Sequence, residues 1–411
     1  MIGFKQIICA CSLMVFSGMG VAQNNTNSPY TRYGLGDLSD QYFGNSKAMG
    51  GVAYGLRDNL HINPLNPASY TAVDSLTYLF EGGVSLQSAN VQEQGVKINA
   101  KNSSFDYLAM QFRIRRGIGM SLGVLPYSNV GYNLTQTYQA TETAPAYAKL
   151  LSGDGGLHQL YAGLGAEVFK GFSLGLNVSY FWGDINRRLN MVYPEPAYSY
   201  NENMAISISD YKVDLGFQYT HAFDKKHSIV VGGVFSPKHN LSNSVNKVLT
   251  VNSITTENVD ATFELPNSFG LGLTYNYNKQ LTVGADYSLQ QWSKVKYMNE
   301  ENALLDRHRL SVGAEFIPNP VGRSYLSFVK YRVGAFYSTP YYKINGKRAT
   351  HEYGVTAGFG LPVPRSRSIL SISGQFVKTK GLETNFVSQN LFRVSIGLTF
   401  NERWFFKRKV N

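Results

Sequence analysis

One stretch of the chain has the spacing of a catalytic motif. The run Gly119-Met120-Ser121-Leu122-Gly123 matches G-x-S-x-G, in which a serine is the nucleophile of an esterase. That chemistry needs a sharp turn from a strand into a helix and a histidine base beside the serine. The residues around Ser121 alternate as in a continuous strand, so we do not assign it that role. We predict no catalytic residue and no enzyme.

The sequence likewise gives no motif for metal or cofactor binding. The seven histidines stand at positions 61, 158, 221, 227, 239, 308 and 351, without a metal-ligand spacing such as H-x-x-x-H. The pairs Gly163-Leu164-Gly165 and Gly270-Leu271-Gly272 lack the helix that a phosphate-binding loop needs. We predict no cofactor and no metal site, and interpret these glycines as small residues that leave room inside the fold.

The amino terminus indicates export. Lys5 precedes an apolar run from Ile7 to Phe16, and Gly20-Val21-Ala22 offers small residues for cleavage, so residues 1–22 are predicted to be a signal peptide. Both cysteines, at positions 9 and 11, would leave with it, which excludes disulfides and thiol chemistry in the mature chain. No other stretch is long and apolar enough to predict a membrane-spanning helix.

The elements that position the remaining residues are predicted strands. Residues 281–290 alternate between apolar and polar or small side chains, and the pattern returns over 309–316 and 392–400. A β-sandwich alternates in the same way. Tight turns alternate here with long connections such as 128–156 and 183–204, however, and that asymmetry is typical of outer-membrane barrels. We predict an all-β fold, an antiparallel transmembrane β-barrel of about 14 strands over residues 76–401.

Aromatic and charged residues fit the two sides of such a barrel. Aromatic side chains near strand ends suit the girdles at the bilayer interfaces: Tyr180, Trp182, Tyr219, Tyr287 and Trp292. Charged side chains must avoid lipid, because Arg or Lys at the midplane costs about 2–4 kcal/mol. We expect five arginines to face the lumen, either paired with acidic groups across it or lining an anion path: Arg113, Arg115, Arg309, Arg332 and Arg393.

The net charge of +11 is spread along the chain and ends in a basic tail, residues 402–411, predicted to be periplasmic. We expect no binding to nucleic acid. Residues 23–75 do not alternate and are rich in Gly and Pro, so they are predicted to form a plug within the lumen, with a disordered periplasmic leader as the alternative.

Two motifs in this segment resemble a known family. Ala48-Met49-Gly50-Gly51-Val52-Ala53 and Asn66-Pro67-Ala68-Ser69 are similar to the N-terminal hatch of the FadL/OmpP1/TodX outer-membrane transport proteins, and Leu265-Pro266 to Gln291-Trp292-Ser293 follow the order of a strand pair in that family. The chain ends, Ser28 to Gly34 and Asn401 to Phe405, resemble Bacteroidetes members.

The resemblance implies a 14-stranded barrel with a lumenal hatch and passive uptake of hydrophobic compounds such as long-chain fatty acids. It implies a hatch or ligand role for Gly50, Gly51, Asn66, Pro67 and Ala68, and a lateral portal at the third strand, for which Gly123 and Pro126 are candidates. Ordinary strand termination at the outer rim is the simpler role for Pro126.

Three functions remain open at this point. The first is an outer-membrane channel for hydrophobic compounds, with a small molecule and outer-membrane lipid or lipopolysaccharide as partners. The second is a non-transporting barrel subunit or scaffold of an envelope secretion or assembly complex, with other envelope proteins as partners. The third, a general porin, requires an open lumen.

Overall fold

The computed structural model describes residues 26–93, 96–142, 145–194, 199–251, 254–344, 346–348, 350–381 and 388–403 of the 411. The predicted signal peptide (1–22) and residues 404–411 of the predicted tail lie outside the described residues. Among the described residues, no helix is long and apolar enough to cross a membrane.

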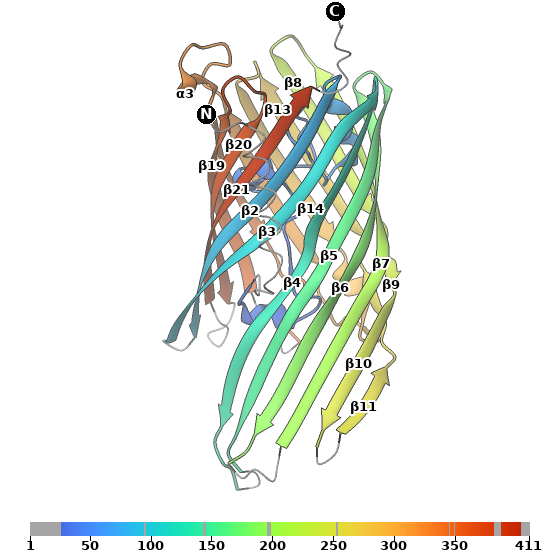
Figure 1. Cartoon of the computed structure of the whole chain (residues 1–411), viewed down its shortest axis with the longest axis vertical. Coiled ribbons are helices and arrows are strands. Elements are labelled where there is room, and N and C mark those ends of the chain that lie inside the picture. Colours follow the sequence, from blue (N-terminus) through green and yellow to red (C-terminus); the bar gives the residue numbers. More distant parts are fainter. Residues whose placement is uncertain are drawn as a thin grey trace, which may run out of the picture.

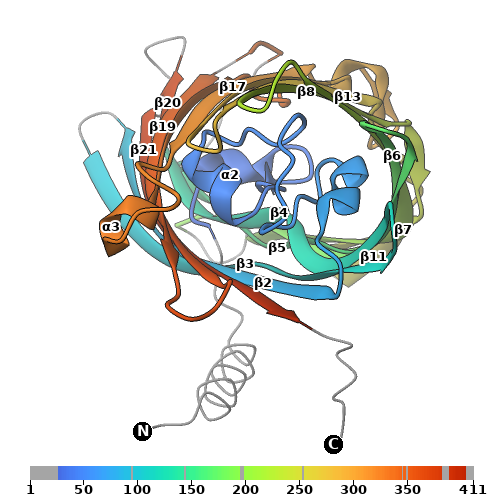
Figure 2. The same cartoon turned by 90° about the horizontal axis from the view of Figure 1, so that it is seen from above.

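A closed antiparallel barrel of 14 strands forms the wall (Figures 1 and 2), as predicted. It closes at β2, which pairs with β3 on one side and β21 on the other. The barrel strands are β2 (Thr77–Glu93), β3 (Val96–Arg115), β4 (Ile118–Tyr138), β5 (Tyr147–Phe169), β6 (Phe172–Val192), β7 (Ser199–Ala222), β8 (His227–Ser236), β13 (Ser268–Tyr277), β14 (Leu281–Gln290), β17 (Arg307–Phe316), β18 (Lys330–Ser338), β19 (Thr350–Pro362), β20 (Ile369–Gly381) and β21 (Ser388–Arg403).

The predicted alternation determines which face of each strand points outward. On β14 the side chains of Val283 and Tyr287 are 42% and 44% exposed, whereas Asp286 between them is buried. β17 and β21 show the same pattern, with exposed Leu310 and Ile396. The outer face of the barrel is therefore apolar and its inner face polar, which suits lipid outside and protein inside.

Strands β4 to β7 are much longer than predicted, at 21 to 24 residues. The long connections expected at 128–156 and 183–204 are wrong, because only residues 139–146 and 193–198 separate these strands. A tilted membrane strand needs only about 9–11 residues. Beyond the membrane the outer face need not be apolar, so alternation fades and the sequence there looks like a loop.

Residues 237–267, between two neighbouring strands of the barrel, form further strands. β8 ends at Ser236 and β13 begins at Ser268. Between them, β10 (Asn243–Thr250) pairs with β7, and β11 (Ile254–Val259) pairs with β10. The outer parts of β4 to β7, together with β10 and β11, form one sheet that extends past the rest of the barrel (Figure 1), here named the projecting wall.

The lengths of the connections at the two ends of the barrel differ less regularly than the sequence predicts. At the end drawn uppermost in Figure 1, here the turn end, most connections are tight, but residues 317–329 between β17 and β18 include the helix α3 (Tyr325–Phe328). The opposite end, here the loop end, carries the long connections 237–267 and 291–306. The predicted strict alternation of short and long connections is therefore wrong.

Residues 26–75, here the lumenal segment, lie inside the barrel (Figure 2). The segment contains η2 (Pro29–Arg32), β1 (Asp37–Leu38), α2 (Gly44–Ala48) and η3 (Pro67–Ala72). Val52, Ala53 and Tyr70 are completely buried. The segment is thus a second layer of structure that fills the space enclosed by the wall.

A cap of loops closes the loop end over this segment. It includes the small sheet of β9 (His239–Leu241), β12 (Phe263–Leu265), β15 (Lys296–Tyr297) and β16 (Glu300–Glu301), and the turn η4 (Trp292–Lys294). Trp292 is completely buried against Tyr341, and the Tyr341 hydroxyl accepts a hydrogen bond from the backbone N–H of Leu35 at 3.0 Å. The prediction that Trp292 belongs to an interfacial girdle is wrong, because its ring is a core residue of the cap.

Glycines on the inner wall make the close fit possible. A Cβ at Gly165 would meet the backbone of Pro67, and one at Gly270 would meet the ring of Tyr54, which confirms their interpretation as residues that leave room. Gly334 on β18 lies against the backbone of Met49 and Gly50 in the same way. The wall and the segment therefore touch backbone to backbone.

Replacing Gly334 by alanine is expected to displace the lumenal segment, because the new Cβ would lie under 3.0 Å from backbone atoms of Met49 and Gly50. Overpacking of this kind costs about 1–3 kcal/mol. Thermal unfolding should begin at a lower temperature, and trypsin should cleave at Lys47 faster than in the original chain.

Gly374→Ala on β20 is the matched control, since the nearest heavy atom to its Cβ would be 4.0 Å away. Equal unfolding temperatures and cleavage rates for the two variants would contradict the described packing.

Candidate functional site

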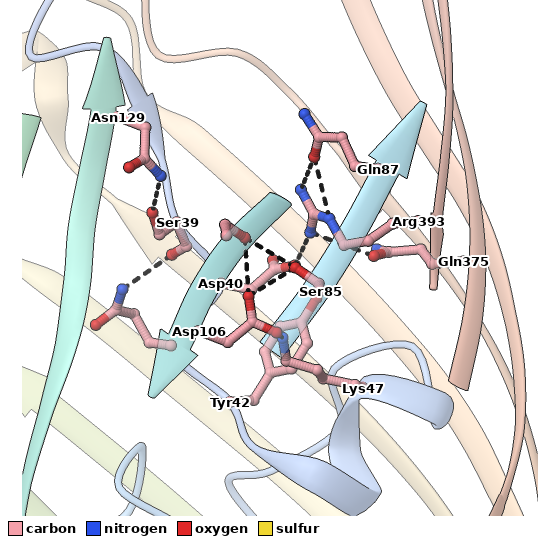
Figure 3. Close-up of polar contacts among 12 residues, drawn as sticks. Ser39, Asp40, Tyr42, Lys47, Ser85, Gln87, Asp106, Asn129, Gln375 and Arg393 are labelled. Atoms are coloured by element: carbon pink, nitrogen blue, oxygen red, sulfur yellow. Dashed lines mark hydrogen bonds and ion pairs between the residues drawn. The ribbon is translucent and has the colours of Figure 1, made fainter. Parts of the chain in front are cut away.

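A cluster of charges joins the lumenal segment to the wall and is the strongest candidate for a site (Figure 3). Asp40, just after β1, accepts a hydrogen bond from Arg393 Nη1 of β21 at 3.0 Å. Its other carboxylate oxygen lies 3.6 Å from Arg309 Nη1 of β17. One carboxylate thus bridges two arginines from separate parts of the wall, and we name these groups the Asp40 cluster.

Neighbouring groups hold the two arginines in place. Arg393 also donates to Gln87 at 3.1 Å, and Arg309 donates to the hydroxyl of Tyr42 at 2.8 Å. The Arg309 guanidinium lies 4.1 Å from the ring centre of Phe336, which is a cation–π contact. Gln87 and Phe336 of the wall and Tyr42 of the segment thus fix both guanidinium groups beside the carboxylate of Asp40.

A second ion pair lies beside the first. Lys47 of α2 pairs with Asp106 of β3, and that carboxylate also accepts a hydrogen bond from Ser85 at 2.7 Å. Both charged side chains are nearly buried. The segment is thus tied to β3 as well as to β17 and β21.

Burial would raise the pKa of Asp40, but Arg309 and Arg393 outweigh that effect and lower it. A carboxyl whose pKa is lowered on folding stabilises the fold above its unfolded pKa, and this contribution is lost as the pH falls through the folded pKa. Asp40 therefore holds the segment at neutral pH.

The Asp40 cluster lines a cavity of about 140 Å³ whose wall also includes Arg307 and Glu352. A second cavity, of about 100 Å³, lies between the segment and β5 to β14 and contains the ion pair of Lys212 and Asp214, 2.8 Å apart. Both spaces are small and carry charged groups. The first cavity suits water and small polar species better than hydrocarbon, whereas apolar side chains such as Leu125, Leu265 and Phe269 also line the second.

The barrel wall parts beside this cluster. β3 and β4 pair only from Leu108 to Arg115 and from Ile118 to Val124, so their outer portions separate. Gly123 is in the last paired stretch, which ends at Val124, and Pro126, which has no N–H to donate, follows two residues later. The strand does not end there, because β4 continues to Tyr138, so the expected termination at Pro126 is wrong.

The lumenal segment occupies this opening. Gln41 donates to the carbonyl of Pro126 at 3.0 Å, and the N–H groups of Ser39 and Ser28 donate to the carbonyls of Tyr127 and Gly131. A portal role for Gly123 and Pro126 remains a prediction, and in this arrangement the opening is filled by protein.

The Asn66-Pro67-Ala68 motif serves to build and anchor η3. The Asn66 side chain caps that turn by accepting from the N–H of Ala68 at 3.2 Å, and it donates to the carbonyl of Phe217 on β7 at 3.0 Å. Pro67 occupies the first position of the turn, where its missing N–H costs nothing. None of the three lines either of the two cavities described above.

Gly50 and Gly51 end α2 with positive φ angles of 68° and 92°, which glycine adopts without strain. The N–H of Gly50 donates to Thr356 of β19 at 2.9 Å, and its carbonyl accepts from Arg309 at 3.4 Å. These glycines therefore position the segment against the wall and bring it to the Asp40 cluster.

The five predicted lumenal arginines separate into two groups. Arg332, fully buried, pairs with Glu315 at 2.7 Å and faces the ring of His61 at 3.2 Å, so it joins Arg309 and Arg393 in contacting the segment. Arg113 and Arg115 lie at the β3–β4 turn, where the strand register shifts between them. Arg309 and Arg393 thus meet the segment in the Asp40 cluster, and Arg332 meets it separately at His61.

Several site residues escaped the sequence analysis. Asp40, Lys47 and Asp106 are single charges without a motif, and nothing in their spacing indicates that they meet. Glu81 of β2, which accepts from the N–H of Ile62 at 3.0 Å and from the Tyr107 hydroxyl at 3.1 Å, is a carboxylate on an inward position. The inward position of Glu81 in the strand alternation was the one feature of the sequence that could have predicted its role.

A family model described as BamG matches residues 1–411, the whole of the chain. The chain belongs to the BamG family. No curated protein matches this BamG-family chain in sequence.

Solved structures share the fold of this BamG-family barrel at low identity. The Ralstonia pickettii toluene transporter TbuX is 14% identical, with 89% of this chain and 99% of that chain covered and a TM-score of 0.59. The Pseudomonas putida toluene transporter TodX is 15% identical, with 90% and 100% covered and a TM-score of 0.59. A Pseudomonas aeruginosa FadL homologue is 13% identical, with 89% and 98% covered and a TM-score of 0.58. These likenesses confirm the predicted FadL-type barrel.

Asp40→Asn is expected to loosen the lumenal segment, because it leaves Arg309 and Arg393 without the carboxylate between them. Removing one partner of a buried ion pair costs about 3 kcal/mol or more. The measurement is the rate of proteolysis within residues 26–75 of the folded barrel in detergent, which should rise.

Arg188→Gln serves as the control, since its pair with Asp154 is half exposed and contributes less than about 1 kcal/mol. A rate for Asp40→Asn that matches this control would show that the cluster does not hold the segment.

Proposed function

We propose that this protein is a non-transporting barrel subunit of a complex that assembles or secretes other proteins at the Gram-negative outer membrane. The observation that carries this proposal is the filled and charged lumen. A hydrophobic solute on its way through would have to break the bridge from Asp40 to Arg309 and Arg393 and pass cavities lined by ion pairs. Each unpaired buried charge left behind would cost several kcal/mol.

The projecting wall supports the same role. A channel needs strands that cross the bilayer, yet β4 continues for 14 residues beyond its last pairing with β3, at Val124. At about 3.3 Å per residue that is on the order of 40 Å of additional strand. Such a sheet above the membrane offers contact area for other proteins and does nothing for passage through the lumen.

In this proposal the signal peptide directs export, the turn end faces the periplasm and the projecting wall faces the cell exterior. Lipid and lipopolysaccharide surround the apolar outer face, and the stable partners are other envelope proteins. The lumenal segment acts as a permanent filling of the barrel that keeps the wall in shape.

Uptake of hydrophobic compounds is the second candidate. It is supported by the fold shared with the toluene transporters TbuX and TodX and by the opening between β3 and β4, which would give a lateral exit if the segment moved. In that case residues 23–75 would act as a hatch, with Gly50, Gly51, Asn66, Pro67 and Ala68 at its moving parts.

Depletion of the protein in its native cell separates the two candidates. We expect the amounts of other outer-membrane barrels to fall while uptake of radiolabelled palmitate and toluene per cell stays constant. Quantitative proteomics of the outer membrane and a filter uptake assay provide the measurements.

A strain complemented with the Arg188→Gln chain is the control for expression from a plasmid. Loss of uptake with a normal set of outer-membrane barrels would reject the assembly role and favour the channel.

A further inference from the structure

The edge of β4 already accepts an added strand. Up to Gly131, the lumenal segment pairs with this edge. β1 lies antiparallel to it with Asp37 opposite Asn129, and the N–H of Ser28 donates to the carbonyl of Gly131 at 3.1 Å. These contacts replace the ladder that β3 would otherwise provide. The backbone of β4 therefore already forms hydrogen bonds with an added segment along this edge.

The same edge continues past the segment. The backbone groups of Gly131 point to the edge, and because strand residues alternate, those of Asn133, Thr135 and Thr137 point there too. Among the described residues, none of these three has a hydrogen-bond partner on that side. Each therefore offers one donor and one acceptor to an incoming strand.

Nothing in this stretch protects it from pairing. Residues 132–138 read Tyr-Asn-Leu-Thr-Gln-Thr-Tyr, with no lysine, proline or bulge of the kind that shields exposed edges. Pairing with β5, and through it with the other strands of the projecting wall, keeps this stretch extended. An unprotected edge of this type is a template for pairing with another polypeptide.

Over residues 132–135 the two faces of the edge differ in polarity, whereas residues 136–138 are exposed on both faces. Tyr132 and Leu134 turn toward the apolar core of the loop end, and Leu134 is only partly buried. Asn133, Thr135 and Thr137 on the outer face are exposed and polar, which excludes lipid as the covering layer. A strand that fits here places apolar side chains beside Leu134 and polar ones beside Thr135.

We propose that residues 132–138 of β4 bind an extended segment of a partner protein by antiparallel β-strand addition, continuing the ladder that β1 begins. The occupant is a polypeptide with alternating apolar and polar residues, held mainly by main-chain hydrogen bonds. This inference rests on the proposed function, because it names the surface through which the barrel holds its partner.

The test replaces two N–H donors at the edge. In Thr135→Pro/Thr137→Pro the edge loses both donors, while Thr135→Val/Thr137→Val keeps them and removes only the hydroxyls. Proline is tolerated on the free side of an edge strand, and the heat-dependent gel shift of a folded barrel checks that each variant folds.

Affinity-tagged chains are isolated from native membranes in mild detergent and their complexes sized by native gel and mass photometry. We expect the original chain and the valine variant to carry the partner, and the proline variant to carry about tenfold less. Equal amounts in all three would overturn strand addition and leave the proposed function standing. A chain that is isolated alone in every case, including the original, would overturn both.

Discussion

The contact between buried carboxylates of the lumenal segment and basic groups of the wall is the interaction on which the interior depends. A barrel in lipid turns its polar faces inward, so charges such as Arg309, Arg332 and Arg393 collect in the lumen. In an open pore, water would solvate these charges. Here Asp40 of the segment and Glu315 of the wall compensate them, and the filled lumen follows from that pairing.

The parts of the fold that could be predicted are those where one physical constraint acts alone. Inside the bilayer, lipid outside and polar packing inside impose strict alternation, and the strands around Val283 and Ile396 follow it. Where β4 to β7 leave the membrane, the outer face meets water and the constraint disappears. The residues 128–138 then look like a loop although the pairing of β4 with β5 continues without interruption to Tyr138.

The site could be predicted only where a local backbone requirement marks the sequence. Asn66 before Pro67 is a capping pattern, and Gly50 with Gly51 marks a positive φ, so short motifs revealed both. Asp40 and Arg393 are 353 residues apart in the sequence, and their contact forms only when the barrel closes around the segment. No local pattern encodes it. Asn66, Gly50 and Gly51, which belong to motifs, position the segment. Asp40 and Arg393, which belong to none, hold it in place.

The opening between β3 and β4 is covered in part by the segment that these charges hold. A closed barrel has no free edge, but a wall in which β3 stays with β2 and separates from β4 must expose one. The lumenal segment covers the first part, where β1 and Ser28 satisfy the backbone from Tyr127 to Gly131. From Asp37 the segment runs along β4 toward Tyr127 and then enters the lumen, where the two arginines hold Asp40. The described part of the segment therefore covers the edge of β4 only between Tyr127 and Gly131, and residues 132–138 lie beyond it.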